Sequence, residues 1–219
     1  MTVSGPGTFA GTTNVQGGTL LVNNTWASAS VPVSLGATLG GIGALTGAVA
    51  VSGTIAPGAS IESLGTGNLS IGASGTLDIE LGRSGLTPTA DRVDVTGTVT
   101  LDIAGGASLK LTKYTGLANP VTGDVFYLIA NDDVDSVTGV FTELDGVATT
   151  LNEGSTFTWN GQDWQITYAA NYDSAVPANS SFTGGNDVAI QALTSVPEPA
   201  SIGMLGLVGV GILARRRRR

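Results

Sequence analysis

A short step of one glycine, one or two small residues and one aliphatic residue recurs through the first half of the chain. Its aliphatic positions include residues 20, 39, 55, 77 and 99, which lie 19, 16, 22 and 22 residues apart. A repeat near 20 residues with one short strand per step is typical of the rungs of a solenoid. Glycine allows the positive φ that a tight corner needs. We therefore predict a β-solenoid (a parallel β-helix) over residues 1–115, continuing toward the N-terminus in a longer precursor.

Alternation of apolar and polar residues supports strands in the same region. The run Leu77-Asp78-Ile79-Glu80-Leu81 places every second side chain on one face, as a half-buried strand requires. The side chains expected to point inward are Leu20, Leu39, Leu77, Ile79, Leu101 and Ile103. A two-sheet antiparallel sandwich also gives short strands at regular spacing, so it remains the alternative.

The composition of the chain limits the catalytic groups, metal ligands and partners that it can have. The chain has no Cys and no His, so thiolate and imidazole groups cannot serve as nucleophiles, bases or metal ligands. Residues 1–195 carry 16 acidic and 4 basic residues, and such a body repels the phosphates of nucleic acids. We expect no cofactor and no nucleic-acid partner.

Residues 116–193 are richer in aromatic side chains than the repeats. Strands are predicted over residues 125–130, 139–144, 156–159, 164–169 and 187–192. The dipeptide Asn160-Gly161 indicates a hairpin between two of them, although four intervening residues exceed the usual two-residue turn. We expect these strands to form an antiparallel β cap, because a bare terminal rung would expose core and unpaired backbone.

Residues 194–219 form a third segment with two prolines, an uncharged stretch and a basic end. Fifteen uncharged residues are short for a transmembrane helix, but arginine side chains can extend to the interface. A buried globular helix is the alternative, yet it would show a polar face. We predict one C-terminal transmembrane helix that leaves the arginines in the cytoplasm. Its residues are Ala200, Ser201, Ile202, Gly203, Met204, Leu205, Gly206, Leu207, Val208, Gly209, Val210, Gly211, Ile212, Leu213 and Ala214. The basic end is Arg215, Arg216, Arg217, Arg218 and Arg219.

The order of these parts resembles the PEP-CTERM sorting signal of Gram-negative envelope proteins. The residues that carry the resemblance are Val196, Pro197, Glu198 and Pro199, followed by the apolar stretch and the arginines. In that family the membrane-embedded enzyme exosortase recognises the signal. The resemblance implies exosortase as a partner, transient anchoring in the inner membrane, cleavage near Pro197-Glu198-Pro199, and delivery to the cell surface or the extracellular space.

The body resembles the β-helical passenger and strand-repeat regions of autotransporters, in residues 11–23, 55–60, 91–97 and 184–188. No basic segment followed by an apolar one opens the sequence at Met1, as a secretory signal peptide would. A sorting signal requires export, so we expect this chain to be part of a longer precursor. The resemblance favours a non-enzymatic structural or adhesive protein whose partners include exopolysaccharide or other matrix components.

An enzyme is the alternative function, because parallel β-helices also host polysaccharide lyases and hydrolases. Catalysis would require paired carboxylates near a basic residue. The candidate groups are Asp78, Glu80, Asp91, Asp94, Arg83 and Arg92. Outward acids on a strand also serve simply to keep the surface solvated, and we favour that interpretation.

Two further sites were considered. Asp132, Asp133 and Asp135 could hold Ca²⁺, but they lack the remaining residues of a calcium loop, so an acidic surface turn is favoured and no metal is expected. Trp159 and Trp164 could stack on sugars if they were exposed, whereas packing in the cap core is the simpler expectation.

Overall fold

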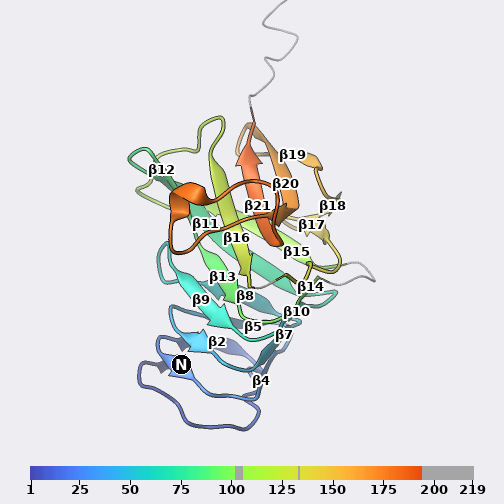
Figure 1. Cartoon of the computed structure of the whole chain (residues 1–219). Coiled ribbons are helices and arrows are strands. Elements are labelled where there is room, and N and C mark those ends of the chain that lie inside the picture. Colours follow the sequence, from blue (N-terminus) through green and yellow to red (C-terminus); the bar gives the residue numbers. More distant parts are fainter. Residues whose placement is uncertain (102–105, 133, 194–219) are drawn as a thin grey trace, which may run out of the picture.

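A computed structural model describes residues 1–101, 106–132 and 134–193, and these residues form strands, turns and one short 3-10 helix, η1 (Pro177–Asn179) (Figure 1). For these residues the prediction of a mostly β fold is confirmed. The strands form three sheets with parallel and mixed pairing. The first sheet contains β1 (Thr2–Val3), β2 (Gly18–Val22), β5 (Ala37–Gly41), β8 (Thr54–Pro57), β11 (Thr76–Ser84), β12 (Thr87–Ala90), β15 (Ser108–Lys113), β17 (Phe141–Leu144) and β18 (Val147–Leu151).

The other two sheets complete each circuit of the chain. The second contains β4 (Ser30–Val33), β7 (Ala48–Val51), β10 (Leu69–Ile71) and β14 (Val99–Leu101). The third contains β3 (Thr25–Trp26), β6 (Ala44–Leu45), β9 (Ser63–Thr66), β13 (Arg92–Val95), β16 (Val125–Asn131), β21 (Asp187–Ala192), β20 (Gln162–Ala170) and β19 (Thr156–Trp159).

Strands three apart in sequence are neighbours in the same sheet. β2, β5, β8 and β11 pair in parallel in the first sheet, while β3, β6 and β9 and then β4, β7 and β10 do so in the other two. The chain therefore visits the three sheets in turn. Over residues 1–115 of the described chain the one antiparallel strand pair is the β11–β12 hairpin. This pairing contradicts the antiparallel sandwich that the strand spacing left open.

Four of the five recurring aliphatic residues form a buried ladder across the first sheet, whereas the fifth, Val99, lies in β14 of the second sheet and pairs with Leu69. Leu20 pairs with Leu39, Leu39 with Ile55, and Ile55 with Leu77. Leu39, Ile55 and Leu77 have no exposed surface, and Leu20 is 8% exposed. Their alignment gives each circuit one inward aliphatic side chain on top of the last, so the ladder buries apolar surface continuously. Of the other predicted inward residues, Ile79 and Leu101 are buried, and Ile103 lies outside the described residues.

The C-terminal part adds antiparallel strands to one end of this arrangement (Figure 1). β16 pairs in parallel with β13 on one side and antiparallel with β21 on the other, and β20 lies between β21 and β19. All five strands predicted here are observed, with β17 beginning at Phe141 and β20 beginning at Gln162. β18 was not predicted.

The hairpin turn at Asn160-Gly161 is shorter than the sequence suggested. Trp159 pairs with Gln162, so only two residues connect the strands. Both have positive φ, 50° and 72°, which is the backbone that a type I′ turn requires. The predicted transmembrane helix lies outside the described residues. Among the residues that are described, no helix has the length and hydropathy needed to cross a bilayer.

Candidate functional site

The structure distributes the candidate catalytic acids among separate partners. Lys110 Nζ donates to Asp78 Oδ2 at 2.6 Å, across neighbouring strands of the first sheet. Arg92 is paired with Asp94, with Nη2 at 3.2 Å from Oδ2. Arg83 and Asp124, which the sequence did not suggest as a pair, also form an ion pair. Arg83 Nε lies 3.0 Å from Asp124 Oδ2, without the alignment of a hydrogen bond.

Asp91 is buried, with 2% of its surface exposed. Its Oδ1 accepts a hydrogen bond from the backbone N–H of Glu62 at 3.1 Å, and its Oδ2 accepts one from Glu80 at 3.0 Å. The carboxylate thus ties the segment before β9 to β11. Burial raises the pKa of Asp91 to about 7, and the two backbone donors act in the opposite direction. This acid holds backbone groups that would otherwise be unpaired.

The acidic turn that was considered for Ca²⁺ is used for main-chain contacts. Asn131 Nδ2 and Asn186 Nδ2 both donate to the backbone oxygen of Asp135, at 2.6 and 2.9 Å. The backbone oxygen of Asp132 accepts a second bond from Asn186. Asp133 lies outside the described residues. Among the residues described, no group of three or more acidic side chains has the arrangement of a metal site.

The two tryptophans considered for sugar stacking pack on each other in the cap. Their ring centroids are 5.7 Å apart in an edge-on arrangement, and Trp164 Nε1 donates to the backbone oxygen of Trp159 at 3.1 Å. Trp164 is 1% exposed and also contacts Phe126, so its ring faces are not open to a ligand. Core packing is therefore the role of Trp164.

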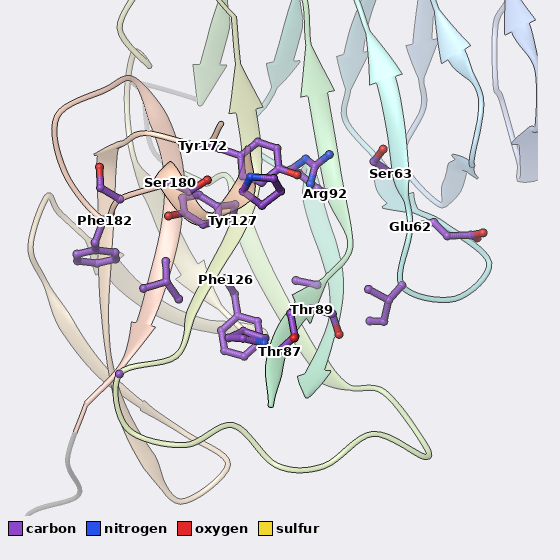
Figure 2. A pocket seen from close by; sticks show the side chains of 17 residues that line it. Glu62, Ser63, Thr87, Thr89, Arg92, Phe126, Tyr127, Tyr172, Ser180 and Phe182 are labelled. Atoms are coloured by element: carbon purple, nitrogen blue, oxygen red, sulfur yellow. The ribbon is translucent and has the colours of Figure 1, made fainter. Parts of the chain in front are cut away.

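A hollow of about 590 Å³ lies beside the third sheet, and its lining includes Arg92, one of the candidate catalytic residues (Figure 2). Its walls come from β9, β12, β13, β16 and the connection between β20 and β21. The Arg92 guanidinium carbon lies 4.1 Å from the centroid of the Tyr172 ring, a cation–π contact. The Tyr127 and Tyr172 rings are 5.1 Å apart, and the Tyr127 hydroxyl is hydrogen-bonded to Ser180. We call these four residues the aromatic cluster.

A buried aspartate beneath the aromatic cluster fixes the position of one of its residues through a hydrogen bond. Asp187 is 3% exposed and accepts hydrogen bonds from the backbone N–H groups of Asn131, at 2.6 Å, and Tyr172, at 2.5 Å. Burial raises the pKa of Asp187, while these donors and the nearby Arg92 lower it. Asp187 thereby positions Tyr172 over Arg92.

Little in the sequence pointed to this cluster. The sequence suggested Arg92 only as a basic residue beside candidate catalytic acids, and Tyr172 belongs to a segment, 171–186, for which no structure was predicted. The two are 80 residues apart, and only the docking of that segment on the third sheet brings them together. The one available signal was the concentration of aromatic residues after residue 116.

The predicted sorting residues, 196–219, lie outside the described residues, so their assignment depends on sequence comparison. Residues 195–219 match the PEP-CTERM protein-sorting motif. PEP-CTERM signals are processed by exosortase, so the match supports an exported protein with exosortase as its partner. None of the curated proteins compared with the chain matches it. The resemblance of the body to autotransporter passengers is accordingly not supported.

Proposed function

We propose that this protein is a non-enzymatic structural or adhesive component of the cell surface or extracellular matrix, delivered there through its PEP-CTERM motif. The observation that carries the proposal is the match of residues 195–219 to that motif. An exosortase substrate passes through the envelope, so the body before residue 195 performs its role outside the cytoplasm.

The body in this proposal is a β-solenoid, whose rungs are the circuits through the three sheets. The parallel pairing of strands three apart and the ladder from Leu20 to Leu77 support it. Stacked rungs make a rigid, elongated support whose outward positions vary freely. That arrangement suits a protein that displays a surface, and the acidic body suits a hydrated matrix.

The tail acts as a temporary anchor. Pro197 and Pro199 cannot donate backbone hydrogen bonds, which favours a cleavage region accessible to the enzyme. Glu198 resists entry into hydrocarbon and marks the membrane boundary. We propose that the uncharged stretch, residues 200–214, enters the membrane and that the terminal arginines bind anionic lipids at its cytoplasmic surface.

Fractionation of an exosortase-positive host tests the proposal. Deleting residues 196–219 from the exported protein should send the body to the soluble periplasmic fraction instead of the surface. Glu198→Ala should leave membrane insertion intact but slow cleavage, so uncleaved protein accumulates in the inner membrane. Mass spectrometry of mature surface protein should find no peptide containing the terminal arginines.

The matched control is Glu143→Ala, an acidic residue of the body outside the signal, which should leave processing unchanged. Mature protein that still carries the arginines, or a surface yield unaffected by the deletion, would contradict the sorting proposal.

A further inference from the structure

A second hollow, of about 530 Å³, lies on the outward face of the third sheet next to the aromatic cluster. Thr25, Ala44, Gly65 and Asp94 line it, and they are aligned in register on the consecutive strands β3, β6, β9 and β13. Ser63 lines both hollows, and the Arg92–Asp94 ion pair joins them. The two hollows thus form one continuous surface, which we call the sheet groove.

The shape of the sheet groove suits an extended chain. It crosses five strands, from β3 to β16, and neighbouring strands lie about 4.8 Å apart, so it runs for about 19 Å along the stack. Small outward residues, Ala44 and Gly65, form its floor. The connection between β20 and β21, with Tyr172 and Ser180, overhangs one end as seen in Figure 2.

The floor of the sheet groove offers no free strand edge. β6, β9 and β13 are each paired on both sides, so their backbone groups are already hydrogen-bonded within the sheet. A peptide could not add to this surface as another strand, which is how sheets commonly bind extended peptides. An occupant must be recognised by side chains projecting from the face.

Those side chains provide aromatic ring surfaces, hydrogen-bond donors and acceptors, and charged groups of both signs. Tyr127, Tyr172 and Phe182 are half-buried and line the hollow, and the Arg92 guanidinium already covers one face of the Tyr172 ring. Glu62, Thr87 and Ser63 add a carboxylate and hydroxyls. Sugars present the matching pattern, because their C–H faces pack on aromatic rings and their hydroxyls both donate and accept. We propose that the sheet groove binds an uncharged, linear oligosaccharide segment, an inference that rests on the proposed matrix role and gives that role a site.

Charge favours an uncharged ligand over a polyanion. The Arg92 guanidinium is already neutralised by Asp94, and Glu62, in the segment before β9, is exposed. The body as a whole carries a large excess of acids over bases. An acidic polysaccharide would therefore meet the exposed carboxylate of Glu62 and a body of net negative charge, and be repelled.

Calorimetric titration of the purified full chain, held in mild detergent, tests this assignment. The probes are three neutral hexasaccharides, of β-1,4-glucose, β-1,4-xylose and β-1,4-mannose, and a hexagalacturonate of the same length. We expect at least one neutral hexasaccharide to bind, and the hexagalacturonate to bind at least tenfold more weakly. Failure of all three neutral probes, or tighter binding of the acidic one, would overturn the proposal.

Variants locate the site. Tyr172→Ala should weaken binding at least tenfold, whereas Tyr172→Phe retains the ring and should keep most of the affinity. Ala44→Gln, which fills the floor at the far end, should weaken binding of the hexasaccharide but not of the matching disaccharide. Phe9→Ala removes an aromatic side chain that is 53% exposed and lies outside the groove, so it should have no effect.

Unfolding transitions matching that of the unaltered protein show that each variant is folded. Equal losses in Tyr172→Ala and Phe9→Ala would overturn the assignment of the site. These measurements use purified protein. Failure of the protein to bind a saccharide therefore does not affect the fractionation test of sorting, and failure of sorting does not alter the binding curve.

Discussion

At the scale of single residues, buried acids connect parts of the chain that the strand ladders do not. Asp91 and Asp187 each accept two backbone N–H groups, and each joins segments far apart in sequence. Asp187 links β16 to the segment that carries Tyr172. Leaving such donors unpaired in a buried setting would be costly, so these carboxylates stabilise the connections between strands.

The raised pKa of Asp91 makes stability depend on pH. The folded protein retains this proton up to about pH 7, whereas the unfolded chain loses it near the ordinary aspartate pKa of 3.8. Between these values the folded state binds more protons, so the free energy of unfolding should fall as the pH rises and level off above about 7. Urea unfolding at a series of pH values measures this slope.

Asp91→Asn removes the titrating group and should flatten that part of the slope. Asp173 is the matched control, because it is an exposed aspartate whose pKa is lowered chiefly by the backbone N–H of Val176. Asp173→Asn should leave unchanged the fall in the free energy of unfolding between about pH 4 and pH 7. A slope that Asp91→Asn leaves unchanged would contradict the role of Asp91.

At the scale of elements, glycines permit the close stacking of strands and corners. Gly41 ends β5 with φ at +109°, and a Cβ there would lie 2.2 Å from the backbone oxygen of Val22 on neighbouring β2. Both the backbone angle and the space therefore require glycine at this corner. The glycine content of the repeats thus reflects how tightly one circuit lies against the next.

Replacing Gly41 by Ala should lower the free energy of unfolding by about 2 kcal/mol or more, because strain and collision with Val22 add together. Gly17→Ala is the control, since Gly17 is exposed and a Cβ there meets nothing within 4 Å. Chemical unfolding of both variants checks the difference. Equal stability of the two variants would show that the corner relaxes without cost.

At the scale of the whole molecule, the C-terminal strands protect one end of the stack. β21 lies between β16 and β20, and it contributes Val188 and Ile190, which have no exposed surface. Beneath it, Phe126 and Trp164 pack with ring centroids 5.7 Å apart. The last described strand therefore covers aromatic core and occupies two strand edges that would otherwise pair with other chains.

Ending the chain after residue 186 removes β21 and should expose both edges and the aromatic core. We expect loss of cooperative thermal unfolding and aggregation at micromolar concentration, measured by circular dichroism and size-exclusion chromatography. The control ends the chain after residue 194, which keeps β21 and removes only the tail. This longer form should remain monomeric and unfold cooperatively. A monomeric, cooperative shorter form would show that β21 is not needed for the cap.

The sequence alone determined the features that depend on local pattern. Alternation located the buried positions of β11, and four of the five recurring aliphatic residues proved to be partners in one ladder. Asn160-Gly161 located a hairpin because few residues tolerate two successive positive φ angles. The sorting motif was legible because its signal is the linear order of prolines, apolar residues and arginines.

Only the tertiary structure decided between parallel circuits and an antiparallel sandwich, because both bury alternate residues of short strands. The tertiary structure also decided which acidic side chains bind buried backbone groups and which form ion pairs at the surface. Asp91 and Asp94 look alike in sequence, yet one is buried on backbone donors and the other pairs with Arg92 at the surface. The aromatic cluster likewise exists only because the connection before β21 folds back onto β13, and no local pattern encodes a contact between Arg92 and Tyr172.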